Sequence, residues 1–226
     1  MKSIVLVVGY TDKQNVTHRD VEIGKRLRGA DVFAIDDDPQ SALPANYQSL
    51  ILSRAITKFG LLRMPVPLSV LLALDSIDRD DLIEACNALD AEGSDGRKFE
   101  VLADNKVRLA NGLDLDGVVY DVAEFGHRIT GYDYVAAEKE GLADARKAFF
   151  LIGRQIVRLS QSDGQAVLDG PFDLDTLERF YARDLYALRQ GAELFRQSFR
   201  RPRKAVQAGA GSDSVRADEG DGSKRS

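Results

Sequence analysis

The chain has 226 residues, of which 44% are hydrophobic and 30% charged, a balance typical of a folded globular protein. The formal net charge of −5 argues against nucleic-acid binding, which usually needs a basic face. A single cysteine, Cys86, excludes an intramolecular disulfide and a metal site of cysteines alone, as expected in a reducing cytoplasm. We expect no signal peptide and no membrane partner, since no apolar stretch approaches the roughly 18 residues that span a bilayer.

The first elements predicted along the chain are two strands that form a hairpin. Residues 3–9 are rich in β-branched and apolar side chains, residues 11–15 are turn-forming, and residues 16–23 alternate imperfectly between apolar and polar. Helices are predicted next, because apolar residues recur at helical spacing. The first helix starts at Asp38-Pro39 or at Leu43-Pro44 and extends to Phe59, before Gly60. The next two cover residues 68–74 and 80–89.

The chain then repeats itself. Residues 5–33 match residues 107–135 without a gap, and eight of the 29 pairs are identical. A block that begins at Leu50 matches one at Phe150 with a spacing of 100, and a block at Leu71 matches one at Leu174 with a spacing of 103. Because three blocks occur in the same order at nearly the same spacing, we interpret the chain as two copies of one module.

The second copy repeats the predicted elements of the first. It has a hairpin over residues 106–125 with an Asp116-Gly117 turn, followed by helices over residues 134–159, 174–181 and 184–199. The sequence therefore predicts an α+β fold of two tandem small modules, 1–92 and 99–200, each a β-hairpin followed by about three α-helices. Residues 201–226 lack the apolar content needed to fold, so we predict a disordered C-terminal tail.

Few residues suggest chemistry. His18 and His127 do not correspond between the copies and lack the partners that a metal or catalytic site would need, and Cys86 is interpreted as a buried thiol. Acidic clusters at residues 36–38 and 78–81 could bind a divalent cation, but they lie where helices begin, and we favour capping. Asp114-Leu115-Asp116-Gly117 lacks the remaining ligands of a calcium loop. We predict no catalytic residue, no metal site and no cofactor, and hence a protein that is not an enzyme.

The sharpest local pattern is Gly-x-Arg-x-x-Gly-x-Asp, which occurs once in each copy. In one interpretation, its charged residues belong to a partner-binding surface; they are Arg26, Asp31, Arg128 and Asp133. In the other, which we favour, the pattern forms a strand-to-helix connection, with the arginine and the aspartate as an ion pair or cap. Arg54 and Arg154, inside apolar segments, could each extend its charged end to solvent or pair with an acid of the same module.

The second copy is rich in aromatic residues, most of which we expect to form a core. Phe195 and Phe199 lie four residues apart at the end of the last predicted helix. This spacing places them on one helix face, so they are the candidates for an exposed partner contact.

The order of these features resembles the small tail assembly chaperones of Mu-like and related tailed phages. The resemblance covers most of residues 1–199. In the first copy it depends on the segments 26–31, 71–74 and 78–82, which read Arg-Leu-Arg-Gly-Ala-Asp, Leu-Leu-Ala-Leu and Asp-Arg-Asp-Asp-Leu. In the second copy it depends on segments 128–133, 174–177 and 183–185, which read Arg-Ile-Thr-Gly-Tyr-Asp, Leu-Asp-Thr-Leu and Arg-Asp-Leu. Members commonly have one module, whereas this chain has two.

The resemblance implies a non-enzymatic protein of the infected host's cytoplasm. It would bind the tape-measure protein, keep it in solution and help to recruit the tail-tube protein; association into a homo-oligomer is left open. Two other functions stay open. The chain could be a structural component of a phage tail or baseplate that remains in the virion, or a metal-dependent enzyme that uses the acidic clusters.

Overall fold

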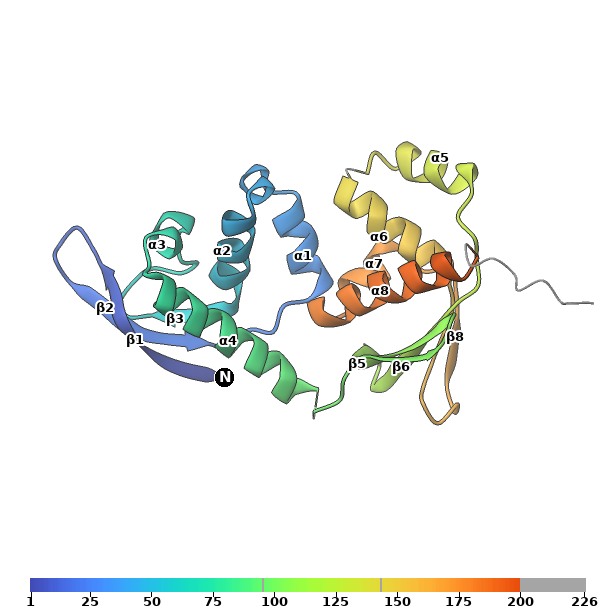
Figure 1. Ribbon diagram of the computed structural model, residues 1–226, viewed down its shortest axis with the longest axis horizontal. Coiled ribbons are helices and arrows are strands. Elements are labelled where there is room, and N and C mark those ends of the chain that lie inside the picture. Colours follow the sequence, from blue (N-terminus) through green and yellow to red (C-terminus); the bar gives the residue numbers. More distant parts are fainter. Residues whose placement is uncertain (95, 143, 200–226) are drawn as a thin grey trace, which may run out of the picture.

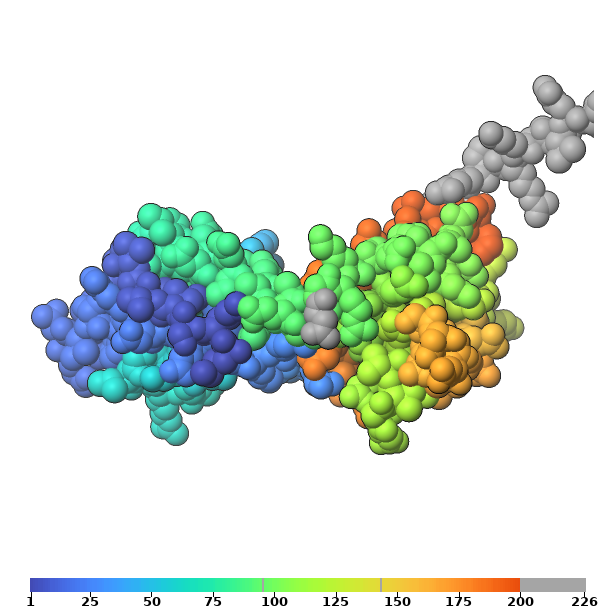
Figure 2. Space-filling view, turned by 90° about the horizontal axis from the view of Figure 1, so that it is seen from below, coloured from blue at the N-terminus to red at the C-terminus, as the bar shows by residue number. Residues whose placement is uncertain are grey.

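A computed structural model describes residues 1–94, 96–142 and 144–199 of the chain. The described part has an α+β fold, as predicted, with eight α-helices and two antiparallel sheets of three and five strands. Figure 1 shows two lobes side by side along the long axis, which we call the front half (residues 1–94) and the back half (residues 96–199). The space-filling view shows a narrower waist between them (Figure 2).

The front half begins with the predicted hairpin, β1 (Lys2–Thr11) and β2 (Thr17–Ile23). The following elements are α1 (Gly29–Asp36), the 3-10 turn η1 (Pro39–Ala42), α2 (Pro44–Ala55), β3 (Ile56–Phe59), α3 (Leu68–Leu72) and α4 (Ser76–Gly93). The sheet has the order β1-β2-β3, so β1 is an edge strand. Helix α4 packs across β1.

The back half adds a strand before its hairpin and another after its third strand. Its strands are β4 (Glu100–Ala103), β5 (Lys106–Leu115), β6 (Val118–Phe125), β7 (Ile156–Ser160) and β8 (Val167–Asp169), in the order β4-β5-β6-β7-β8. Its helices are α5 (Gly131–Lys139), α6 (Asp144–Gln155), α7 (Leu174–Glu178) and α8 (Ala182–Ser198). Asp116 and Gly117 form the predicted turn between β5 and β6, with φ of 53° and 84°.

The two halves share one element order: two strands, two helices, a third strand and two helices. They also share an unusual contact. The Asp78 carboxylate of α4 accepts hydrogen bonds from three consecutive backbone N–H groups of β1, residues 7–9. Asp184 of α8 does the same for residues 110–112 of β5. Because strands β1 and β5 have irregular pairing at these residues, the carboxylates satisfy N–H groups that the ladder leaves free. That the halves arose by duplication stays a prediction.

In the structure, the spacing between corresponding residues of the two halves differs from the predicted one in the last part of the repeat. Asp78 and Asp184 are 106 positions apart, and α3 and α7 begin with the same spacing, so the last two helices of each half correspond at 106 rather than 103. An error of three residues is close to one helical turn, which leaves the apolar residues on the same helix face. The spacing of 100 between α2 and α6 agrees with the prediction.

Each half also has a third strand and four helices rather than about three. The helix predicted over residues 134–159 is in fact α5, α6 and β7, and residues 56–59 form β3 rather than the end of a helix. In β3 the buried residues Ile56 and Phe59 are three apart, which is a helical spacing. A bulge in the pairing with β2 lets both face the core, and β7 repeats this arrangement against β6.

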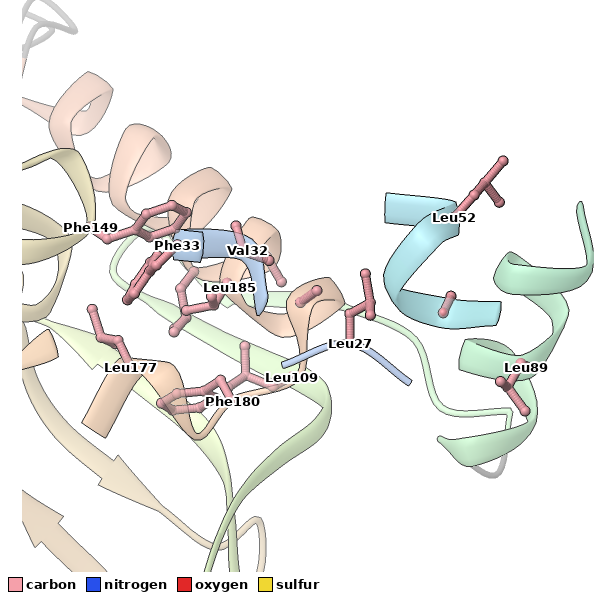
Figure 3. Close-up of a cluster of buried hydrophobic side chains, with 14 of the residues drawn as sticks. Leu27, Val32, Phe33, Leu52, Leu89, Leu109, Phe149, Leu177, Phe180 and Leu185 are labelled. Atoms are coloured by element: carbon pink, nitrogen blue, oxygen red, sulfur yellow. The ribbon is translucent and has the colours of Figure 1, made fainter. Parts of the chain in front are cut away.

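One cluster of buried apolar side chains extends through both halves. Leu52 of α2 and Leu89 of α4 lie in its front part, and Leu109, Leu177 and Phe180 lie in its back part (Figure 3). Helix α1 joins the two, since its Val32 and Phe33 lie among back-half side chains (Figure 3). That each half folds independently stays a prediction.

Two predictions concern segments beyond these elements. The tail predicted over residues 201–226 lies outside the described residues. Within the described ranges, none of the helices has both the length and the apolar character that crossing a bilayer requires.

Candidate binding surface

The Gly-x-Arg-x-x-Gly-x-Asp pattern forms a strand-to-helix connection in both halves. Asp31 and Asp133, each the third residue of its helix, accept the backbone N–H of the residue before the helix, at 3.1 and 2.8 Å. These bonds cap N–H groups that a helix start leaves without partners. The glycine at the start of each pattern lies against a strand: a Cβ on Gly24 would lie 2.8 Å from Thr57 of β3.

Each aspartate is also the centre of an ion-pair cluster. Asp31 pairs with Lys25 at 2.6 Å and with Arg54 at 3.7 Å. Asp133 pairs with Arg154 at 3.4 Å and has a hydrogen-bond contact with the His127 ring at 3.1 Å. The prediction that Arg54 and Arg154 pair with an acid of the same half is confirmed.

Asp133 is nearly buried, yet its pKa is lowered. Burial alone would raise the pKa of this carboxyl. Hydrogen bonds from the Thr130 backbone, the His127 ring and the Thr130 hydroxyl outweigh burial, so the pKa of Asp133 lies well below its ordinary value. The carboxylate is therefore a structural anion that fixes the start of α5.

Arg26 and Arg128 have different surroundings. Arg26 reaches from the front half into the back half, where its guanidinium lies 3.9 Å from the ring centroid of Tyr181 and donates a 2.5 Å hydrogen bond to the Asn111 side-chain oxygen. Its Nε lies 3.5 Å from the Asp90 carboxylate. Arg128 instead lies over the exposed ring of Phe199 at 4.5 Å. Of these two corresponding arginines, Arg26 contacts the other half, whereas Arg128 contacts its own.

Phe195 and Phe199 differ in exposure. Phe199 is 48% exposed, as predicted, whereas Phe195 is 6% exposed, so the expectation of an exposed Phe195 is wrong. The Phe195 ring stacks on Phe125 of β6 at 6.2 Å and meets Phe199 edge-on at 4.9 Å. Because α8 lies on the sheet of the back half, their common face is covered at Phe195, whereas Phe199 follows the last residue of the helix and stays half exposed.

The connection between β2 and α1 is bound by the back half. The Gly29 N–H donates to the Phe180 carbonyl at 2.8 Å, and the Ala182 N–H donates to the Leu27 carbonyl at 2.9 Å. A Cβ on Gly29 would lie 2.3 Å from the carbonyl oxygen of Leu177, so this close approach requires glycine.

A cavity of about 440 Å³ lies between the halves, beside α1. Its inner surface is mainly apolar. Front-half residues on one side include Leu27, Val32, Ile51, Ala55, Cys86 and Ala91, and back-half residues on the other are Ala182, Arg183 and Tyr186. Lys25, Asp90 and Arg183 add charged groups to this lining. An apolar cavity with a few charged groups is the usual form of a binding pocket.

Two groups in this lining have raised pKa values. Burial, with a contribution from the Asp90 carboxylate, raises the pKa of the Cys86 thiol to about 12. Burial also raises the pKa of Asp90, although Arg26 opposes this shift. Cys86 is therefore a neutral thiol at neutral pH, but it is half-buried in the cavity lining rather than buried as predicted.

The other acidic and histidine residues have structural contacts. Asp38 accepts the Gln40 N–H at the start of η1, as predicted for a cap. Asp78 accepts hydrogen bonds from β1 rather than capping α4. The cap of α4 is Asp75, which lies just before the cluster predicted to cap this helix. His18 is buried and contacts the Asp12 carboxylate at 3.0 Å. Within the described ranges, no three or more His, Cys, Asp or Glu residues form a group that could hold a metal ion.

Comparison of the chain with models of protein families, with curated proteins and with solved structures finds no match. The sequence pattern led to Arg26 and Asp31, but Tyr181, Tyr186 and Asn111 carry no motif. In the sequence, the one signal for the contact between the halves is Gly29, because a glycine can mark a place where two backbones approach closely.

Proposed function

We propose that this protein is a phage tail assembly chaperone that binds the tape-measure protein in the host cytoplasm. The sequence resemblance supplies the client, and the apolar cavity between the halves carries the proposal. A tape-measure protein presents long amphipathic helices, whose apolar faces aggregate when exposed. A chaperone needs an apolar surface of its own to cover them.

The cavity suits side chains from one face of such a helix. Its opposing sides come from α2 and α4 in the front half and from the start of α8 in the back half, so an inserted helix would contact both. Arg183 can pair with acidic residues of the client, whereas Lys25 and Asp90 are already paired with Asp31 and Arg26 within the chain. The net charge of −5 helps to keep a loaded complex in solution.

The test is co-expression with the tape-measure protein encoded in the same genome. The wild-type chain is expected to keep that protein in the soluble fraction and to co-purify with it. Ile51→Glu and Ala91→Glu place a carboxylate in the cavity and are expected to abolish co-purification. Ala91 is exposed at the end of α4, so this variant keeps the fold. Leu61→Glu, on an exposed loop residue, is the matched control and is expected to behave as wild type.

Three outcomes contradict the proposal. A tape-measure protein that stays insoluble with the wild-type chain rejects the chaperone function. Co-purification that survives both cavity variants rejects the cavity as the binding site. Abundant peptides of this chain in purified phage particles, measured by mass spectrometry, would instead identify a structural tail component.

A further inference from the structure

The helix after the hairpin packs on different halves in the two copies: α1 packs against α6, α7 and α8 of the other half, whereas α5 packs against α6 of its own half. α1 and α5 begin with the same aspartate cap. Val32 and Phe33 of α1 are 2% and 0% exposed, because they face α6, α7 and α8. Their counterparts at the spacing of 102, Tyr134 and Val135 of α5, are 46% and 47% exposed.

The glycine at the start of α5 shows the same contrast. A Cβ on Gly29 would clash with the Leu177 carbonyl at 2.3 Å, whereas a Cβ on Gly131 meets nothing within 4 Å. Gly29 is needed because α1 packs closely against the other half. Gly131 of α5 is the same residue at the same position, but no contact among the described residues needs a glycine there.

The groove that receives α1 also has a counterpart. In the back half, Ala145 and Ala148 of α6 and Tyr186 and Arg189 of α8 line a cavity together with Val32 of α1. In the front half, the residues at the same positions of α2 and α4 line a cavity of about 230 Å³; they are Ala45, Gln48, Asp80 and Ile83. Within the described ranges, no helix lies there as α1 does in the back half.

We propose that α5 of one copy of the chain docks into this front-half groove of a second copy, as α1 docks within the chain. Figure 1 shows α5 at the opposite end of the molecule from α2, α3 and α4, so the pairing needs a second copy. The two surfaces differ, so the interface is heterologous, and repetition produces a ring or an open chain of copies.

The backbone contacts of the in-chain interface can be repeated between copies. The carbonyl of Leu74 corresponds to that of Phe180 and would accept the Gly131 N–H. Ser76, the first residue of α4, corresponds to Ala182, and its N–H would donate to the Ile129 carbonyl. N–H groups at a helix start have no partner within the helix, so this donor suits an external acceptor.

The side chains of the groove complement those of α5. Tyr134 takes the place of Val32, beside Asp80 and Arg79. Arg79 has a buried Nε without a hydrogen-bond partner among the described residues. The Tyr134 hydroxyl can donate to the exposed Asp80 carboxylate beside it. Asp75 corresponds to Tyr181, so the contact of Arg26 with an aromatic ring becomes an ion pair between Arg128 and Asp75.

The first test measures mass against concentration by analytical ultracentrifugation of the full chain. The wild-type mass is expected to rise from 24.9 kDa to at least its double as the concentration approaches millimolar. Gly131→Leu fills the open space at the start of α5, keeps the monomer fold and is expected to return the mass to that of the monomer. Gln197→Leu adds the same side chain at an exposed position of α8 and is expected to associate as wild type.

The second test is a disulfide cross-link in a Cys86→Ala background. Tyr134→Cys and Asp80→Cys are made in separate chains, which are mixed and oxidised; a cross-linked dimer is expected only in the mixture. A wild-type chain that is monomeric at all concentrations, an oligomer that Gly131→Leu leaves intact, or the absence of the mixed dimer would overturn the proposal. Neither test involves Ile51 or Ala91, so the outcome is independent of client binding.

Discussion

Phe33 of the front half packs against Phe149 of the back half, with ring centroids 5.1 Å apart and planes inclined by 47°. Both rings are buried, and α1 carries Phe33 out of its own half to reach this position (Figure 3). The contact is part of the buried apolar cluster that extends through both lobes. Its removal should therefore affect stability and the association of the halves together.

Phe33→Ala is expected to lower the free energy of unfolding by about 3–5 kcal/mol, because it removes a fully buried aromatic side chain and leaves a cavity. Urea unfolding followed by circular dichroism measures this change. Phe199→Ala, at a half-exposed ring, is the control and should cost clearly less. Equal losses for the two variants would contradict the assignment of Phe33 to the common core.

Gly29→Ala is expected to destabilise the protein, because the added methyl group would meet the Leu177 carbonyl at 2.3 Å. The matched change Gly131→Ala meets nothing within 4 Å and should be neutral or stabilising by up to about 1 kcal/mol, since alanine favours a helix. Thermal unfolding of both variants at low concentration tests the contrast. Similar melting temperatures would show that α1 is not held as described.

Asp78→Ala and Asp184→Ala are each expected to cost about 3 kcal/mol or more, because three strand N–H groups lose their acceptor. Glu84→Ala, on the exposed face of α4, should change stability by no more than about 0.5 kcal/mol. Urea unfolding provides the comparison. If the aspartate variants unfold at the same urea concentration as Glu84→Ala, the carboxylates do not hold the strands.

Acidification is expected to destabilise the protein through Asp133. Because the pKa of this carboxyl is lower in the folded chain than in the unfolded one, its stabilising effect is present above the unfolded value of about 3.9 and is lost as the pH falls toward the folded value. Asp133→Asn should be less stable than wild type at neutral pH and should lose less stability on acidification.

The pKa of Asp36 is shifted in the opposite direction to that of Asp133, so its effect on stability has the opposite pH dependence. Burial raises the pKa of Asp36, so its effect on stability becomes less favourable as the pH rises through the folded value. Asp36→Asn should therefore gain stability relative to wild type toward neutral pH. Unfolding measured between about pH 2 and 7 separates the two variants, and parallel pH profiles would contradict both assignments.

The sequence predicted the elements that local pattern determines. Both hairpins, the Asp-Gly turn and the α+β class are as expected, because alternation and turn residues report local structure. The short third strands were missed, since Ile56 and Phe59 have a helical spacing that only a bulge converts into a strand face. The spacing of apolar residues alone cannot distinguish a helix from such a bulged strand.

The candidate site was predictable only in part. Asp31 and Asp133 were found because a cap depends on residues close in sequence. Tyr181 and Asn111 were not, because their contacts with Arg26 join residues more than 80 positions apart. Phe195 was assigned to the surface because helical spacing identifies a common face but not what covers it.

The docking of α1 has a consequence for how firmly the lobes are held. Helix and groove belong to one polypeptide, so the short linkers confine them to a small volume and the contact forms at a high effective concentration. Dilution cannot separate them. The same contact between two separate molecules would have no such linker, so it would form only at a sufficient concentration. The covalent connection therefore maintains within the chain an interaction that would dissociate on dilution between chains.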